Sequence, residues 1–292
     1  MGALDGRVAI ITGAGRGIGR AHALLFAAEG ACLVVNDRGA GPDGTGTDRS
    51  AAESVVDEIT AAGGEAVASH HDVADWDGGR ELVATAIDAF GDLDILVNNA
   101  GILRDRLLVN MSEEEWDDVI AVHLKGHFVP TRWAAAHWRD RHDRGNGHFA
   151  NVVHTSSTSG LVGNPGQTNY GSAKAGVGAF SAIVAQELER YGVRSNCVVP
   201  AARTRLTQST PGLAELLAPP NDGGAFDVWD PANVSPLVAY LSTEDCPFTG
   251  ATFFVQGGSV RRFEPWRLGQ GIDRDQRWTV EGLADEMPRL QG

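Results

Sequence analysis

The chain has 292 residues, of which 42 % are hydrophobic and 21 % are charged, a composition ordinary for a globular protein. Its formal net charge of −14 argues against nucleic acid and anionic membrane as default partners, because an acidic surface repels both. Cys32, Cys197 and Cys246 have no paired spacing, so free thiols are expected rather than disulfides or a zinc site. No secretory signal or apolar run of membrane-spanning length is visible, and a cytoplasmic location is expected.

Strand and helix patterns alternate along the chain. The predicted strands are unbroken apolar runs, typical of strands covered by helices on both faces, at residues 7–12, 32–36, 65–69, 93–97, 149–153, 193–200 and 251–256. Helices are predicted over 17–29, from Ser50 as the cap to about 63, over 78–90, and over 169–191. Ser112 and Glu115 form a capping box that opens a long helical region, which contains Gly126 and Pro130 and is therefore either kinked or divided.

Repeated strand–helix units predict a single-domain α/β fold with a Rossmann-type, doubly wound parallel sheet. We expect this domain to span residues 1–258, with a substrate loop at 201–229 that is rich in Pro and Gly. Residues 259–292 form a polar tail that carries Phe263, Trp266 and Trp278. These aromatic residues indicate that the tail packs on the domain or on a neighbouring subunit.

A glycine-rich turn, TGAGRGIG at residues 12–19, lies between the first predicted strand and the first predicted helix. Glycines let the backbone turn sharply and approach a pyrophosphate, while the helix N-terminus offers free N–H groups to the anion. The strand–turn–helix context makes this pattern more specific than a glycine cluster alone. The predicted cofactor contacts in the turn are Gly13, Arg16, Gly17, Ile18 and Gly19.

Asp37 follows the second predicted strand, twenty residues after Gly17. A carboxylate there can accept hydrogen bonds from the adenosine ribose and repels a 2′-phosphate, which favours NAD over NADP. Arg38 and Arg16 leave the other choice open, since either guanidinium can receive a 2′-phosphate.

Ser157, Tyr170 and Lys174 have a spacing that predicts a catalytic group. Tyr170 and Lys174 are four residues apart in a predicted helix and therefore share one face. Ser157 lies just beyond a predicted strand, so its hydroxyl can reach the same point. An ammonium beside a phenol stabilises the phenolate, and we expect a lowered Tyr170 pKa that suits acid–base catalysis.

These motifs together resemble the short-chain dehydrogenases/reductases over about residues 5–258. The resemblance rests on the glycine-rich turn, NNAG at 98–101, Ser157, and Tyr170 with Lys174, in that order. It implies that Tyr170 is the acid/base, that Ser157 orients the substrate oxygen, and that Lys174 binds the nicotinamide ribose. It further implies cofactor contacts from Asp72, Val73, Asn99, Ala100, Gly101 and Pro200, the last in a Pro-Ala pair where the family usually has Pro-Gly.

Longer stretches, including GNPGQTNYGSAKAG, resemble the (3R)-hydroxyacyl-CoA dehydrogenase domain of peroxisomal multifunctional enzyme type 2, a subgroup also linked with 17β-hydroxysteroids. The resemblance implies hydride transfer between NAD and a 3-hydroxyacyl-CoA, with a steroid-derived acyl chain as one option. A free hydroxysteroid, a 3-oxoacyl carrier-protein reductase and a non-enzymatic NAD sensor are the alternatives.

His123 stands where most family members have an Asn that holds a water in a proton relay. Either a relay role or a hydrogen-bonded structural histidine fits the sequence. His70, His71 and Asp72 lack a further ligand at motif spacing, so no metal is expected. Small residues on the Tyr170 helix and the family's habit of pairing through it imply a homodimer or homotetramer.

Overall fold

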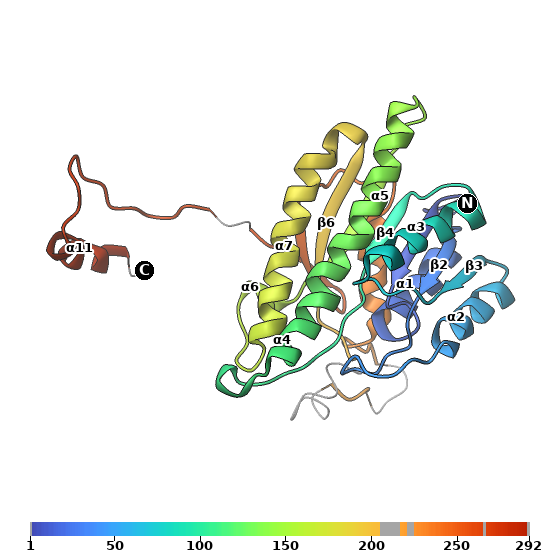
Figure 1. Cartoon of the computed structure of the whole chain (residues 1–292), viewed down its shortest axis with the longest axis horizontal. Coiled ribbons are helices and arrows are strands. Elements are labelled where there is room, and N and C mark those ends of the chain that lie inside the picture. The colour runs from blue at the N-terminus through green and yellow to red at the C-terminus, as the bar shows by residue number, and fades with distance from the viewer. Residues whose placement is uncertain (1, 205–216, 221–224, 265–266, 291–292) are drawn as a thin grey trace.

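The computed structural model describes residues 2–204, 217–220, 225–264 and 267–290. Its strands form one sheet in the order β3-β2-β1-β4-β5-β6-β7-β8 (Figure 1). All pairs from β3 to β7 are parallel, which confirms the predicted doubly wound sheet, and β8 is antiparallel to β7. The strands are β1 (Val8–Thr12), β2 (Cys32–Asn36), β3 (Glu65–Ser69), β4 (Ile95–Asn98), β5 (Ala150–Thr155), β6 (Val193–Pro200), β7 (Thr252–Gln256) and β8 (Ser259–Arg262).

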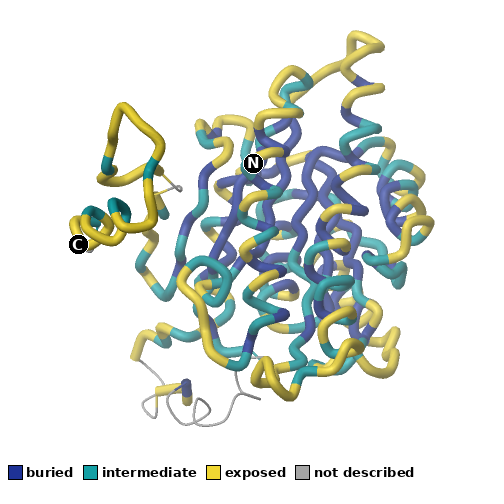
Figure 2. The backbone as a smooth tube through the Cα atoms, turned by 60° about the vertical axis from the view of Figure 1, so that its left-hand side comes forward, coloured by how far each residue is buried: buried dark blue, intermediate teal, exposed yellow. Residues whose placement is uncertain are grey.

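Helices cover both faces of the sheet, and each face has its own apolar core. Ala9 and Ile11 of β1 belong to the core that includes α1, α2 and α10, whereas Val8 and Ile10 belong to the core under α3, α5 and α7. Successive strand residues point to opposite faces, so the strands supply both cores and are buried between the helices (Figure 2). The helices are α1 (Gly17–Ala28), α2 (Ser50–Ala61), α3 (Trp76–Phe90), α4 (Glu113–Ile120), α5 (Gly126–Asp143), α6 (Thr158–Leu161), α7 (Thr168–Leu188), α10 (Ser235–Leu241) and α11 (Val280–Glu286).

Some local predictions are wrong. The strand at 251–256 is not the last, because β8 pairs with it through residues that the sequence analysis placed in the tail. Ser50 does not cap α2; it is the first helical residue, and its hydroxyl donates to Asp48. The helix predicted from residue 78 begins at Trp76, with the Asp75 carboxylate accepting a hydrogen bond from the Gly78 N–H.

The tail leaves the sheet at β8. Figure 1 shows α11 set apart from the domain, at the end of an extended segment. Leu268, Val280 and Met287 are exposed there, so their apolar side chains have little contact with the domain. Among the residues described, no helix is both long enough and apolar enough to cross a membrane.

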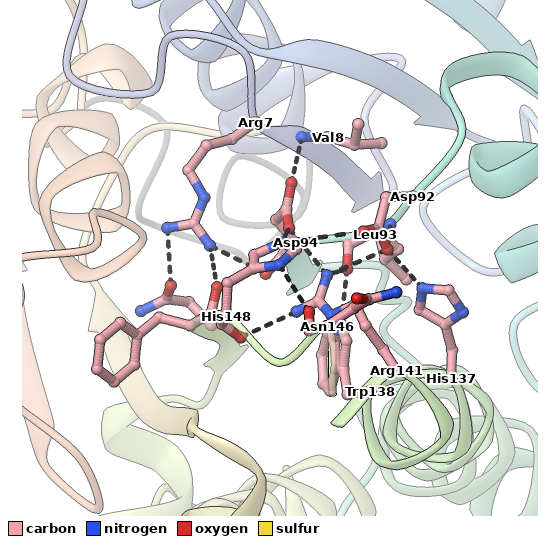
Figure 3. Close-up of polar contacts among 12 residues, drawn as sticks. Arg7, Val8, Asp92, Leu93, Asp94, His137, Trp138, Arg141, Asn146 and His148 are labelled. Atoms are coloured by element: carbon pink, nitrogen blue, oxygen red, sulfur yellow. Dashed lines mark hydrogen bonds and ion pairs between the residues drawn. The ribbon is translucent and has the colours of Figure 1, made fainter. Parts of the chain in front are cut away.

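A network of charged residues, buried at its centre, lies at the amino ends of the strands (Figure 3). Arg7 donates to Asn151 Oδ1 (3.1 Å), Ser242 O (2.9 Å) and Phe149 O (2.8 Å). Asp94 accepts from the Val8 N–H (3.0 Å), from Arg141 (3.1 Å) and from His148 (2.6 Å). Asp92, Asp94 and His148 lie close enough to share a metal ion, but Arg141 Nη1 lies 3.1 Å from both carboxylates and already supplies the positive charge. We call Arg7, Asp92, Asp94, Arg141 and His148 the amino-end network.

Candidate active site

A cavity of about 460 Å³ opens at the carboxyl ends of the parallel strands, where this sheet topology places ligands. Every catalytic or cofactor-binding residue that the sequence predicts lines this cavity. Its lining includes Gly13, Arg16, Gly17, Ile18, Gly19, Asp37, Asp72, Val73, Asn99, Ala100, Gly101, His123, Ser157, Tyr170, Lys174 and Pro200.

At Gly13 and Gly19 the glycine-rich turn leaves no room for a side chain. A Cβ at Gly13 would lie 2.8 Å from Ala100 Cα, and one at Gly19 would lie 2.1 Å from Gly13 O. Gly17 has a φ of +55°, a conformation that glycine adopts without strain. Arg16, the N-cap residue of α1, makes no side-chain capping hydrogen bond in the described part of the chain, and the first residues of α1 line the cavity. This arrangement fits a bound pyrophosphate.

Charged residues surround the adenosine end of the cavity. Asp37 accepts from the Gly15 N–H through Oδ2 (2.8 Å) and from the Gly39 N–H through Oδ1 (2.6 Å). A carboxylate has about four lone-pair positions, so each oxygen retains one for a ribose hydroxyl. Both arginines that could take a 2′-phosphate are already paired, Arg16 with Asp48 and Arg38 with Asp72, each at 2.5 Å.

Thr12, the first residue of the glycine-rich turn, makes contacts that the sequence did not predict. Its Oγ1 accepts from the backbone N–H groups of Asn99 (2.9 Å) and Ala100 (3.1 Å), and Asn99 Nδ2 donates back to Thr12 O (3.0 Å). These bonds hold the NNAG segment against the glycine-rich turn. Both segments had been recognised separately, but nothing in either indicated that they contact each other.

Ser157, Tyr170 and Lys174 meet at the inner end of the cavity. Ser157 caps the short helix α6 through its Oγ, which accepts from the Ser159 N–H (3.1 Å). Tyr170 lies in the first turn of α7, and Lys174 lies one turn later with only 2 % of its surface exposed. Lys174 Nζ donates to Thr155 O (2.6 Å) and lies 5.7 Å from the centroid of the Tyr170 ring.

The expected lowering of the Tyr170 pKa is wrong. Burial raises this pKa to about 12; a hydrogen bond with Ser157 opposes the change, and the negative charge of Asp105 adds to it. Burial also lowers the pKa of Lys174 to about 7. Desolvation is the largest cause of both shifts, and the charge of Lys174 is not among the causes of the Tyr170 shift.

His123 lies on a π-helical turn, η2 (Ala121–Lys125), which joins α4 to α5 without a break. Its Nε2 lies 2.8 Å from Ile102 O and 3.1 Å from Ile102 N, and its ring meets the Tyr170 ring edge-on at 5.0 Å. Burial and the charge of Lys174 hold its pKa well below the usual value, so the imidazole is neutral. The contacts of Nε2 fit a hydrogen-bonded structural histidine, whereas the buried Nδ1 has no partner among the residues that the structure describes, which leaves that nitrogen available for the relay role. A π turn at such a position often marks a functional site.

The substrate side of the cavity is only partly described. Ala202, Leu217 and Trp229 line it, and the Arg203 N–H donates to Trp229 O (2.7 Å). Arg203 also binds Leu217 O (2.7 Å) and pairs with Asp227, which ties the described ends of the loop together. Residues 205–216 and 221–224 of the predicted substrate loop lie outside the described residues, as does Trp266 of the tail.

The geometry of this cavity agrees with the comparison with known proteins. A family model described as short chain dehydrogenase matches residues 7–212. The chain belongs to the short-chain dehydrogenase family. It is an oxidoreductase that acts on CH–OH donors.

Two relatives and one solved structure show which members of this family the chain is similar to. The chain is 46 % identical to the hydroxyacyl-CoA dehydrogenase ChsB1 of Mycobacterium tuberculosis, over 96 % of this chain and 85 % of that protein. It is also 46 % identical to peroxisomal multifunctional enzyme type 2 of Drosophila melanogaster, over 96 % of this chain but 44 % of that longer protein. A crystal structure of a short chain dehydrogenase from Mycobacterium avium superposes with a TM-score of 0.87 at 50 % identity, covering 99 % of this chain and 95 % of that one.

Proposed function

We propose that the protein is an NAD-dependent dehydrogenase of 3-hydroxyacyl-CoA thioesters. The observation that carries the proposal is the single cavity in which the glycine-rich turn and Asp37 meet Ser157, Tyr170 and Lys174. The two relatives named for hydroxyacyl-CoA dehydrogenation and for multifunctional peroxisomal chemistry, each 46 % identical, support the choice of substrate class. A steroid-derived acyl chain is one form this substrate can take.

Each catalytic side chain has a proposed task. NAD, when bound, supplies the hydride acceptor at its nicotinamide ring. Tyr170 exchanges the hydroxyl proton of the substrate at its own Oη, and Ser157 donates a hydrogen bond to the oxygen that becomes the carbonyl. Lys174 binds the nicotinamide ribose, and His123 completes the proton path from the Tyr170 side of the cavity.

The raised pKa of Tyr170 predicts how the two directions depend on pH. With a pKa of about 12, the phenol is protonated at neutral pH and can donate its proton to a ketone. Alcohol oxidation needs the phenolate, so its rate should increase with pH through the alkaline range. Rates of both directions, measured from pH 6 to pH 10, test this assignment.

The preference for NAD rests on Asp37. Its carboxylate repels a 2′-phosphate, and ion pairs with Asp48 and Asp72 occupy the two arginines that could attract one. Asp37→Ala should lower the ratio of kcat/KM for NAD to kcat/KM for NADP by about tenfold. A tenfold change corresponds to a loss of about 1.4 kcal/mol of discrimination between the two cofactors. An unchanged ratio would assign the discrimination to Arg16 or Arg38.

The substrate is tested by following reduced cofactor during oxidation of three families of alcohols. These are (3R)-3-hydroxyacyl-CoAs of graded chain length, free hydroxysteroids, and the same hydroxyacyl groups on acyl carrier protein. We expect the CoA thioesters to have the highest kcat/KM. A preference for either other family would replace the proposed substrate, and cofactor binding without turnover of any alcohol would favour the sensor.

We also propose that the enzyme assembles as a homodimer or homotetramer in the cytoplasm. Phe128 and Phe180 line a groove between α5 and α7, and Phe128 is 41 % exposed, which favours a subunit contact there. The exposed apolar side chains of the tail favour a contact with the domain or with a neighbour. Three free cysteines agree with a reducing compartment. Light scattering of the intact chain and of Phe128→Glu tests the assembly.

A further inference from the structure

The loop between β2 and α2 contains a short segment, residues 40–45, that we call the strap. Four of its residues are partly buried and line the cavity, namely Ala40, Gly41, Pro42 and Gly44. The other two, Asp43 and Thr45, are exposed and do not line it. One side of the strap therefore faces the cavity, and the other side faces solvent.

The base of the strap is fixed to the adenosine end of the cavity. A Cβ at Gly39 would lie 2.0 Å from Asp48 O, so the two ends of the loop are in contact with each other. The Gly39 N–H donates to the Asp37 carboxylate, and the Asp48 carboxylate pairs with Arg16 of the glycine-rich turn. These bonds hold both ends of the strap in place.

The tip of the strap is a compact turn with its own hydrogen bonds. The Gly41 N–H donates to Thr45 O (2.7 Å), and the Gly44 N–H donates to Gly41 O (3.0 Å). Asp43 Oδ1 accepts from the N–H (3.1 Å) and the Oγ1 (2.8 Å) of Thr45. The tip thus keeps its shape through contacts within the strap itself.

The tip reaches the loop that follows β4. The Leu103 N–H donates to Pro42 O (2.9 Å), and we call this hydrogen bond the latch. A Cβ at Gly44 would lie 3.0 Å from Ile102 Cδ1, so the tip packs closely against a buried side chain. Among the residues described, the latch is the one backbone–backbone hydrogen bond between the strap and the rest of the chain.

The order of the strands places the strap over the middle of the cavity. β1 lies between β2 and β4, and the three strands are parallel, so their carboxyl ends share one edge of the sheet. A segment that follows β2 and contacts the loop after β4 must pass the carboxyl end of β1. The glycine-rich turn begins there, and it lines the same cavity as the strap. The strap therefore crosses the place that fits a pyrophosphate.

We propose that the strap closes over the middle of the bound dinucleotide and that release of the cofactor requires the latch to open. The inference rests on the proposed binding of NAD in this cavity. Because the base is fixed and one hydrogen bond holds the tip, opening breaks few contacts. The strap thereby sets how long the cofactor stays bound, a role that concerns residues outside the predicted cofactor contacts.

The test measures the rate at which NADH leaves the intact protein. Excess NAD displaces NADH in a stopped-flow instrument, and NADH fluorescence reports its release. Deletion of residues 42–44 removes the tip and the latch, and Gly41 N already lies 2.7 Å from Thr45 O, so the remaining ends lie close enough to join. The dissociation rate should rise about tenfold, as expected for loss of a hydrogen bond and its packing contacts. An unchanged rate would overturn the proposal.

Two glycines of this loop provide a matched pair. Gly44 and Gly46 have φ values of +86° and +75°, so a side chain causes backbone strain at either position. A Cβ at Gly44 meets Ile102, whereas a Cβ at Gly46 has no atom within 4 Å. Gly44→Leu should raise the NADH dissociation rate about threefold to tenfold, and Gly46→Leu should change it less than about twofold. Equal rates in the two variants would mean that strain, not the contact of the tip, matters.

A disulfide tests the closed state from the opposite direction. A Cβ at Gly44 would lie 3.8 Å from Ile102 Cβ, a separation typical of disulfides. Gly44→Cys with Ile102→Cys, oxidised with oxidised glutathione while NADH is bound, should release NADH at least about tenfold more slowly than the reduced form. Dithiothreitol should restore the faster release. Equal release from the two forms would contradict the proposal, and the deletion decides the question if the disulfide does not form.

Failure of the strap can be distinguished from failure of the proposed function. Tight NADH binding with the same dissociation rate in the deletion variant would reject the strap and leave the proposed function in place. If the protein binds NADPH and not NADH, the proposed cofactor preference fails, and the same variants test the strap through NADPH release. Binding of neither dinucleotide would reject both.

Discussion

The two ends of the sheet both bury ionisable groups, but the central groups of each end differ in the partners that they have. In the amino-end network, Arg141 lies between Asp92 and Asp94, and Arg7 donates to three separate acceptors. At the carboxyl end, the one hydrogen-bond partner of Lys174 Nζ among the described residues is the neutral backbone carbonyl of Thr155, and burial lowers the pKa of Lys174 to about 7. Removing one member of a buried charge pair destabilises the fold, because it leaves the other charge without a partner. Buried groups without a charged partner have shifted pKa values, which suit proton transfer.

The difference extends to the direction of the pKa shifts. Partial burial by itself would raise the pKa of Asp92. Hydrogen bonds from His137 and Leu93 and the charge of Arg141 have the larger combined effect, so the pKa lies well below its usual value. At the other end desolvation dominates both Lys174 and Tyr170. Substitutions at the amino end should therefore change stability, and those at the carboxyl end should change chemistry.

The largest expected effect is on turnover. Tyr170→Phe removes the proposed acid/base, and kcat should fall about 10³-fold, within the range of general acid–base catalysis. The ring and its packing are retained, so the dissociation constant of NAD should stay within twofold, as measured by quenching of tryptophan fluorescence. Retained turnover in this variant would remove Tyr170 from the mechanism.

Asp94→Asn tests the opposite end. It keeps the shape of the side chain but leaves Arg141 buried without a full counter-charge, and the free energy of unfolding should fall by about 3 kcal/mol. Urea unfolding measures the loss, and kcat of the folded enzyme should remain within twofold of wild type. Asp88→Asn, an exposed carboxylate on α3, serves as the control and should change neither quantity. A large loss of kcat in folded Asp94→Asn would mean that the two ends are coupled.

Lys174→Met sharpens the comparison through pH. The pKa of Lys174 is lower in the folded protein than in the unfolded chain, so the unfolded chain binds more protons between pH 7 and pH 10, and stability due to this group rises with pH. Between pH 7 and pH 9 the free energy of unfolding of the wild type should increase by about 1–2 kcal/mol, at no more than about 1.4 kcal/mol per pH unit. In Lys174→Met this increase should be absent. Lys125→Met, at the exposed lysine of η2, should retain the rise. Equal slopes in wild type and Lys174→Met would contradict the lowered pKa.

Much of the fold and the site could be predicted because the signals are local. The glycine-rich turn, NNAG and the Tyr170–Lys174 spacing can each be recognised within a few residues, and the apolar runs mark where the parallel strands lie along the chain. β8 was missed because Ser259–Arg262 is short, polar and exposed, with no apolar run to mark it. The π turn around His123 was missed because one extra residue in a helical turn leaves no trace in composition.

What the sequence could not supply is the partner of each group. Thr12 and Asn99 lie 87 residues apart, and Asp105 and Gln167 lie 62 residues apart, so their hydrogen bonds depend on the assembled sheet. The sign of the Tyr170 shift failed for the same reason. Spacing placed an ammonium near the phenol, but the depth of burial, which decides the sign, is a property of the whole fold.

Asp92→Asn has the smallest expected effect. It compares a partly exposed carboxylate of the amino-end network, Asp92, with a buried one, Asp94. The Asp92 side chain is 31 % exposed, against 9 % for Asp94, so water screens its bonds to His137 and Arg141. The loss at pH 7 should be about 1 kcal/mol or less. Because the folded pKa of Asp92 is depressed, its contribution is present above the unfolded pKa and is lost as pH falls. Urea unfolding at pH 7 and at pH 3 should therefore show the difference between wild type and Asp92→Asn narrowing in acid, and a constant difference would mean that packing, not charge, accounts for it.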